Sequence, residues 1–363
     1  MTAADTSDGA VQASDIPSGL GDVLPQHRFD EQRLQAHLAR HLPTTPDRLR
    51  IRQFQGGHSN PTFLLEAGAW RRVLRKQPPG NLLRGAHQVD REYRVMTALN
   101  ESGVPVPRTH LLCTDPEIIG TPFFVMDFVP GLVSAEPHLP EVPMAQRRPV
   151  HLAAMTCLAN LHSVDWQAVG LADYGRPDQY VARQLRTWSR QFEASRTGDM
   201  PAMDNLIRRL GERLPDDVPA SIVHGDFRPG NLILDAAEPG IGAVLDWELS
   251  TLGHPLADLG YYCMPYHLPF GVPGIKGLVG LDLAEAGLPS RDDLLEAYAR
   301  TGPVPGVASI DYFVAFSLFR LAAILQGVYA RALQGNASRA DARDVGERAG
   351  FLAERGWAIA SGL

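Results

Sequence analysis

Short apolar runs of strand length mark the first part of the chain. Turn residues such as Gly68 separate them, and the runs cover residues 49–54, 62–66, 70–76 and 122–128. Residues 30–41 and 90–100 differ, because apolar residues recur there at helical spacing. The pattern therefore predicts a small sheet accompanied by helices.

The rest of the chain is mainly helical by the same criterion. Apolar positions repeat with a helical period over residues 150–163, 178–195, 201–214, 292–299, 312–333 and 338–360. Two short apolar runs between residues 223 and 246 interrupt the helices. This order predicts an α+β fold in which residues 30–128 form a β-rich N-lobe and residues 129–363 form a larger, mainly helical C-lobe. We expect residues 1–29 to form a disordered leader, because Ala, Ser, Asp and Gly dominate their first part.

Bulk composition narrows the class of protein. The 363 residues exceed the ~100–200 of a usual domain, which fits two lobes. A net charge of −7 argues against nucleic-acid partners and anionic membranes, and no run approaches the ~20 apolar residues of a membrane span. Three cysteines without C-x-x-C spacing indicate neither a disulfide framework nor a zinc site, so we expect a cytoplasmic protein.

The richest chemistry lies in the two apolar runs, which read V-H-G-D-F-R-P-G-N-L-I-L-D and A-V-L-D-W-E-L-S. They place four polar side chains, His224, Asp226, Asn231 and Asp246, beside residues that should be buried. A buried charge needs a partner, and a divalent cation with a phosphoryl group would supply one. The interval from Asp226 to Asn231 is that of a kinase catalytic loop, in which a base precedes a metal-binding Asn.

On these residues the chain resembles the aminoglycoside phosphotransferase and choline kinase-like enzymes, whose signature is H-G-D-x-x-x-x-N followed by D-x-E. Within that family, G-G-H-S-N-P-T-F, V-L-R-K-Q-P-P-G and D-R-E-Y-R-V look most like the kinase modules associated with acyl-CoA dehydrogenases. The resemblance covers roughly residues 30 to 340 and implies a protein kinase-like two-lobe fold. It also implies ATP and Mg²⁺ as cofactors.

The resemblance assigns roles in phosphoryl transfer to the catalytic segment. Asp226 would be the base that orients the acceptor hydroxyl, and Asn231 and Asp246 would hold magnesium. His224 would brace the loop. Arg228 would contact either a phosphate or an anionic group of the substrate, and Glu248 would be either a metal contact or a loop anchor.

Nucleotide contacts are expected in the N-lobe. The phosphate loop would run from Gln55 to Asn60 and include Gly57, Ser59 and Asn60. Arg75 or Lys76 would hold the phosphates, and strand alternation favours Arg75 because it shares a face with Val73. Glu92 would pair with that cation. The family pattern puts the adenine contacts on the backbone of Asp127 and Val129.

The acceptor site is expected near residues 253–266 and the helix at 312–333. Residues 260–270 are apolar and aromatic without a carboxylate, which favours an uncharged or anionic hydroxylated small molecule over a polycation. The resemblance implies a hydroxy acid or hydroxyacyl-CoA and a functional link to an acyl-CoA dehydrogenase. Arg320 would meet the substrate carboxylate or brace the strand of Asp246.

Three other functions remain open from the sequence. The chain could be an aminoglycoside or other amino-alcohol kinase, a nucleotide-binding pseudokinase adaptor, or a metal-dependent hydrolase that uses His224, Asp226 and Asp246. The arginine at position 75, where kinases carry lysine, keeps the adaptor in play.

Overall fold

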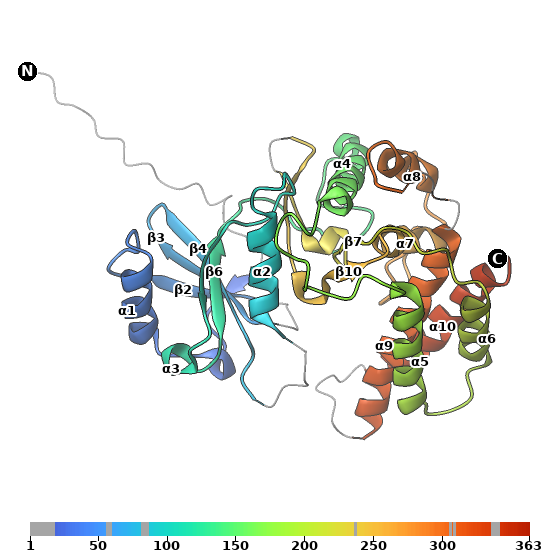
Figure 1. The fold of residues 1–363 in the computed structure, drawn as a ribbon, viewed down its shortest axis with the longest axis horizontal. Coiled ribbons are helices and arrows are strands. Elements are labelled where there is room, and N and C mark those ends of the chain that lie inside the picture. The colour runs from blue at the N-terminus through green and yellow to red at the C-terminus, as the bar shows by residue number, and fades with distance from the viewer. Residues whose placement is uncertain are drawn as a thin grey trace, which may run out of the picture.

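The computed structural model describes residues 19–55, 60–80, 87–235, 238–304, 307, 310–334 and 342–363. Its N-terminal part is built on a six-stranded antiparallel sheet with the order β1-β2-β3-β4-β6-β5 (Figure 1). The strands are β1 (Leu20–Gly21), β2 (Arg50–Phe54), β3 (Thr62–Ala67), β4 (Trp70–Lys76), β5 (Thr109–Cys113) and β6 (Phe123–Asp127).

Strand alternation sends side chains to two different cores. Helix α1 (Glu31–His41) covers one face of the sheet and α2 (Val89–Leu99) the other (Figure 1). In β4, Leu74 belongs to the cluster formed with α1, whereas Val73 belongs to the larger cluster that includes α2. Because successive residues point to opposite faces, Arg75 follows Val73 towards α2 and Lys76 follows Leu74 towards α1.

The C-terminal part is mainly helical and surrounds α9, which packs against α5, α6, α7 and α10. Its helices are α4 (Met144–Ser163), α5 (Tyr180–Ala194), α6 (Pro201–Glu212), α7 (Leu256–Cys263), α8 (Arg291–Ala299), α9 (Ile310–Leu333) and α10 (Ala342–Ala360). The short helix α3 (Pro116–Ile119) belongs to the N-terminal part. The predicted α+β arrangement, a β-rich lobe followed by a helical lobe, is confirmed (Figure 1).

Two small antiparallel ladders position the catalytic segment. Strand β7 (Ser221–Val223) pairs with β10 (Thr251–Gly253), and β8 (Leu232–Leu234) pairs with β9 (Ile241–Val244). The segment between β7 and β8 and the segment between β9 and β10 are therefore neighbours. These are the two segments that carry the sequence motifs.

Part of the predicted leader forms regular structure. Residues 1–18 lie outside the described part, but residues 19–29 are ordered, so the prediction of a disordered leader up to residue 29 was wrong there. Leu20 and Gly21 pair with Phe54 and Gln53 at the edge of the sheet. Single-residue composition could not reveal this, because an edge strand takes its stability from the neighbouring strand.

Helix α9 corrects the expectation that no run approaches a membrane span. By length and composition alone it could cross a membrane, with 24 residues and a mean hydropathy of 1.6 over its most apolar window. That window is 61% buried inside the fold, which is typical of the central helix of a helical core.

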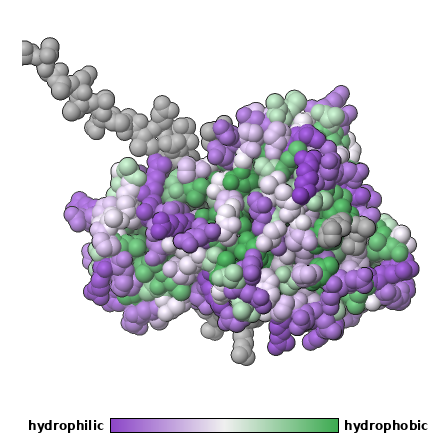
Figure 2. Space-filling model, turned by 45° about the horizontal axis from the view of Figure 1, so that its top comes forward, coloured by the Kyte–Doolittle hydropathy of each residue, from purple (hydrophilic) through white to green (hydrophobic). Residues whose placement is uncertain are grey.

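On the face drawn in Figure 2, hydrophilic residues surround smaller hydrophobic areas.

Candidate active site

The catalytic loop begins directly after β7 and is held by a buried carboxylate. Asp258, on α7, accepts hydrogen bonds from the backbone N–H groups of His224 (2.7 Å) and Gly225 (2.8 Å). His162 lies 3.2 Å from the same carboxylate. Burial alone would raise the pKa of Asp258, but hydrogen bonds from His162 and Gly225 hold it below its usual range.

Gly225 is required where it stands. Its φ of +85° lies in the left-handed region, and a Cβ atom there would lie 2.7 Å from the carbonyl oxygen of Leu249. Glycine thus lets the catalytic loop approach the segment that follows β9. His224 joins the same two segments, because its Nε2 lies 2.9 Å from the carbonyl oxygen of Leu245 while its Nδ1 accepts from the N–H of Asp226.

Asp226 and Asn231 lie together, as their spacing predicts. The Asn231 side-chain nitrogen donates to the carboxylate and to the backbone carbonyl of Asp226, at 2.8 Å each. Arg228 Nε donates to the same carboxylate at 3.2 Å. Although burial works against the charge, Asp226, Tyr261 and Asp246 raise the pKa of Arg228.

Asp246 occupies a strained backbone position. It has φ +66° and ψ +61°, in the left-handed region that non-glycine residues seldom adopt. A 3-10 turn, η4 (Trp247–Leu249), starts directly after it, with Trp247 fully buried. The surrounding structure therefore imposes this conformation, which is typical of functional positions.

Arg75 connects the N-lobe to Asp246. Its Nε lies 2.8 Å from a carboxylate oxygen of Glu92, and its Nη2 lies 2.5 Å from Asp246 Oδ1. Burial disfavours the charge, but Glu92, Asp246 and Glu248 together raise the pKa of Arg75. Lys76 points away to the α1 side, where its ammonium lies 5.3 Å from the centre of the Phe29 ring and burial lowers its pKa.

Glu92 is the deepest member of this group, with its side chain 1% exposed. Burial raises the pKa of Glu92 to about 7, against the opposing effect of Arg75 and of Asn60. Asn60 donates to Glu92 at 2.5 Å, so it supports the ion pair from the end of the predicted phosphate loop. Oxygen atoms of Glu92, Asp246 and Glu248 lie within 4.8 Å of one another.

Other predicted nucleotide contacts are less defined. Gly57 and Ser59 lie outside the described residues. Asp127 ends β6, and its side chain contacts His110 at 2.7 Å and Arg72 at 3.5 Å. Val129 follows the strand, where the chain enters the C-terminal part. The assignment of these two backbone positions as adenine contacts stays a prediction.

Three residues near Asp226 were not predicted correctly from sequence patterns: Asp258 and Tyr261 were not singled out, and Arg320 was expected in another role. Asp258 carried no local motif signal. Tyr261 is partly buried, and burial together with the charge of Asp226 and a hydrogen bond to it raises the pKa of its phenol. Arg320 donates to the carbonyl oxygen of Gly225 and lies over the Tyr261 ring, so it braces the catalytic loop and not the strand of Asp246.

The expected acceptor wall at residues 260–270 also needs correction. Part of this segment belongs to the core: Gly260 packs against Phe313 of α9, and Tyr262 and Cys263 are buried. Of its aromatic residues, Tyr261 is beside Asp226, and Phe270 is 41% exposed. An apolar run in sequence therefore indicated helix packing here more than a binding surface.

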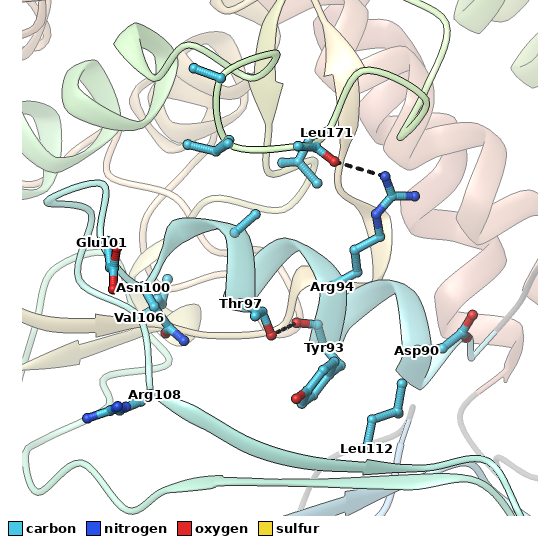
Figure 3. A pocket seen from close by; sticks show the side chains of 14 residues that line it. Asp90, Tyr93, Arg94, Thr97, Asn100, Glu101, Val106, Arg108, Leu112 and Leu171 are labelled. Carbon is cyan, nitrogen blue, oxygen red and sulfur yellow. Dashed lines mark hydrogen bonds between the residues drawn. The ribbon is translucent and has the colours of Figure 1, made fainter.

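A wide groove of about 1350 Å³ lies along α2 (Figure 3). It is lined by the face of α2 that carries Tyr93, Arg94 and Thr97, and by residues 168–171 of the C-terminal part. Glu92 does not line it. The groove is therefore separate from the space in which Arg75, Glu92 and Asp246 meet.

The family model described as the phosphotransferase enzyme family matches residues 50–294, a span that includes Arg75, Glu92, the catalytic loop and Asp246. The chain belongs to this family. Chicken acyl-CoA dehydrogenase family member 11 is 43% identical over 355 residues, which cover 96% of this chain and 46% of that protein. The chain thus spans less than half the length of this relative.

Solved structures agree with the family assignment. One described as a putative aminoglycoside phosphotransferase from Ralstonia eutropha is 40% identical, with a TM-score of 0.83, and covers 92% of this chain and 99% of that one. An aminoglycoside phosphotransferase solved with AMP-PNP and hygromycin B is 15% identical, with a TM-score of 0.58, covering 91% and 99%. The second shares the fold. The kinase-like two-lobe fold and the resemblance stated from the motifs are confirmed.

Proposed function

We propose that this phosphotransferase uses ATP and Mg²⁺ to transfer the γ-phosphoryl group to the hydroxyl of a hydroxy acid or hydroxyacyl-CoA. One observation carries the proposal: Arg75 contacts both Glu92 and Asp246, while Asp226 and Asn231 share a hydrogen bond in the adjacent loop. A phosphate-holding cation, a metal ligand and a base are thereby available around one site.

The side chains fit a magnesium ion by their chemistry. Asp246 and Glu248 offer carboxylate oxygens, and Asn231 turns its nitrogen to Asp226, which leaves its carboxamide oxygen for a cation. Oxygen ligands of this kind suit Mg²⁺. When bound, the ion would neutralise negative charge on the phosphate groups. Arg75 would add a fixed positive charge from the N-lobe side.

Asp226 is the residue we assign to the acceptor hydroxyl. Its carboxylate is held by Asn231 and Arg228, so it stays oriented while it accepts the proton of the hydroxyl. His224, Asp258 and Arg320 hold the backbone on either side of it. Positioning of this kind supplies most of the catalysis in phosphoryl transfer, since little covalent chemistry is needed from the protein.

Arginines near Asp226 favour an anionic acceptor. Arg228 has its side chain 38% exposed beside the base, and Arg320 lies behind Tyr261. A polycationic aminoglycoside would meet repulsion there, whereas a carboxylate or a CoA phosphate would gain a charge-assisted hydrogen bond from Arg228. The acyl-CoA dehydrogenase names of the relatives support a hydroxyacyl substrate and a functional link to such a dehydrogenase.

An acceptor screen tests the proposal. Purified protein with ATP and Mg²⁺ would be offered short hydroxy acids, their CoA thioesters, choline, homoserine and aminoglycosides, and ADP release would be recorded. We expect release that depends on a hydroxy acid or its thioester. Asp226→Asn should lower this rate by about a thousandfold or more while Mg²⁺-dependent AMP-PNP binding persists.

Two results would contradict the proposal. ADP release driven by aminoglycosides and not by hydroxyacyl compounds would move the substrate class to the amino-alcohol kinases. Release of phosphate from esters without nucleotide would instead identify a hydrolase.

A further inference from the structure

Helix α2 is tied to the C-terminal lobe next to the proposed metal ligand. Arg91, which is half-buried, donates from Nη2 to the carbonyl oxygens of Tyr174 (2.9 Å) and Ser250 (3.3 Å). Its guanidinium carbon lies 4.2 Å from the centre of the Tyr174 ring. The Tyr174 hydroxyl lies 3.3 Å from the carbonyl oxygen of Arg91, so the tyrosine contacts both the side chain and the main chain of the helix.

The Ser250 end of this contact leads directly back to Asp246. The Ser250 hydroxyl lies 2.6 Å from the Tyr174 hydroxyl and donates to the carbonyl oxygen of Trp247 at 2.6 Å. The backbone N–H of Ser250 donates to the same carbonyl at 3.0 Å. These bonds close the turn η4, and the fully buried Trp247 anchors it. Ser250 thus ends the turn that starts directly after Asp246.

Two adjacent residues of α2 thus hold both ends of one segment. Glu92 reaches Asp246 through Arg75, and Arg91 reaches Ser250. We infer that Arg91 is a positioning residue for phosphoryl transfer, an inference that rests on the proposed function of Asp246. The hydrogen bonds of Arg91 to Tyr174 and Ser250, called the latch below, join α2 to the segment Asp246–Ser250. They keep Glu92, Arg75 and Asp246 in one arrangement before nucleotide binds.

An arginine suits this position for physical reasons. A planar guanidinium can stack on the tyrosine ring while it donates to two carbonyl oxygens, and a lysine ammonium lacks the stacking plane. Both carbonyls belong to the C-terminal lobe, so each hydrogen bond crosses between the lobes.

Arg94 on the same helix provides a matched control. It pairs with Asp173 and donates to the carbonyl oxygen of Gly170 at 3.0 Å, at the rim of the groove in Figure 3. The two side chains of the Arg94–Asp173 pair are 41% and 79% exposed, and exposed pairs contribute little to stability. The guanidinium carbon of Arg94 lies 5.9 Å from the centre of the Tyr174 ring, against 4.2 Å for Arg91. The hydrogen bonds of Arg94 go to Gly170 and Asp173 and not to Ser250, so its loss should leave Asp246 in place.

Hydrogen exchange in the nucleotide-free protein tests the latch itself. In Arg91→Met, amides of residues 89–99 and 246–250 should exchange about tenfold faster than in the wild type, and Arg91→Lys should fall between. In Arg94→Met, exchange of residues 246–250 should match the wild type. Equal exchange of these residues in Arg91→Met and wild type would overturn the latch, whatever the nucleotide does.

Calorimetric titration with AMP-PNP tests positioning. We expect Arg91→Met to bind AMP-PNP with Mg²⁺ about tenfold more weakly, with affinity in EDTA unchanged and Arg94→Met like wild type. A normal Mg²⁺-dependent affinity in Arg91→Met would overturn the positioning role, even if its amides exchange faster. If wild-type protein takes up no AMP-PNP, the proposed function fails and the positioning role with it, while the exchange data still decide whether the latch exists.

Discussion

Replacing Arg75 by methionine should destabilise the protein, whereas the same change at the neighbouring Lys76 should not. Arg75 is the cation between Glu92 and Asp246, and its side chain is only 14% exposed. Methionine keeps much of the aliphatic stem but removes the charge. The variant leaves Glu92, 1% exposed, without its ion-pair partner, next to two further carboxylates.

The expected loss in the free energy of unfolding depends on whether Glu92 can take up a proton when Arg75 is removed. Removing one partner of a buried ion pair costs about 3–5 kcal/mol. Burial already raises the pKa of Glu92 to about 7, so near neutral pH the carboxyl can take up a proton, which limits the loss to about 3 kcal/mol. Arg75 lowers the pKa of Glu92, so this pKa is higher in Arg75→Met than in the wild type, and the variant loses further stability as pH rises from about 7 through that higher value. The deficit of Arg75→Met should therefore grow from pH 6 to pH 9.

Urea unfolding followed by tryptophan fluorescence at pH 6, 7.5 and 9 measures this. Lys76→Met is the matched control, because Lys76 is the next residue in β4, is 2% exposed and faces α1. Its burial already disfavours the charge, so Lys76→Met should be neutral or slightly stabilising. Added Mg²⁺ should recover part of the stability of Arg75→Met, since it can bind the freed carboxylates.

Two outcomes would refute the reasoning. A larger loss in Lys76→Met than in Arg75→Met would mean that the cation of the site is Lys76. A deficit that is the same at pH 6 and pH 9 would mean that Glu92 does not titrate as its burial requires.

Two further predictions concern buried groups. In Asp258→Asn, the carboxylate that accepts from two backbone N–H groups is replaced by a carboxamide that also donates. The free energy of unfolding should fall by about 3 kcal/mol. An unchanged urea midpoint would exclude Asp258 as the anchor of the loop. Burial lowers the pKa of His151 to about 4, which is below that of the unfolded chain, so stability present above pH 6.5 should be lost as pH falls towards 4. The difference between the folded and unfolded pKa of His151 is equivalent to about 3 kcal/mol. In His151→Gln, the free energy of unfolding should depend less on pH between pH 6.5 and pH 4. An unchanged slope in this range would assign the loss to other groups.

The sequence by itself determined the elements and the chemistry that depends on short intervals. Alternation in β4 was enough to separate Arg75 from Lys76, because neighbouring strand residues must point to opposite faces. The interval from Asp226 to Asn231 likewise predicted their contact, since both lie on one short loop. Helix α2 and strands β2, β3, β4 and β6 follow from periodicity within a few residues, whereas β1 and β5 were not predicted.

Tertiary structure alone decided what supports those residues. Asp258 follows His224 by 34 positions, and Arg91 precedes Ser250 by 159, so no local pattern records either contact. The same holds for the apolar segment at residues 260–270, whose composition suits a binding surface and a core helix equally well. Local spacing constrains the conformation of a short segment, whereas contacts between distant segments depend on how the lobes pack, which the complete fold determines.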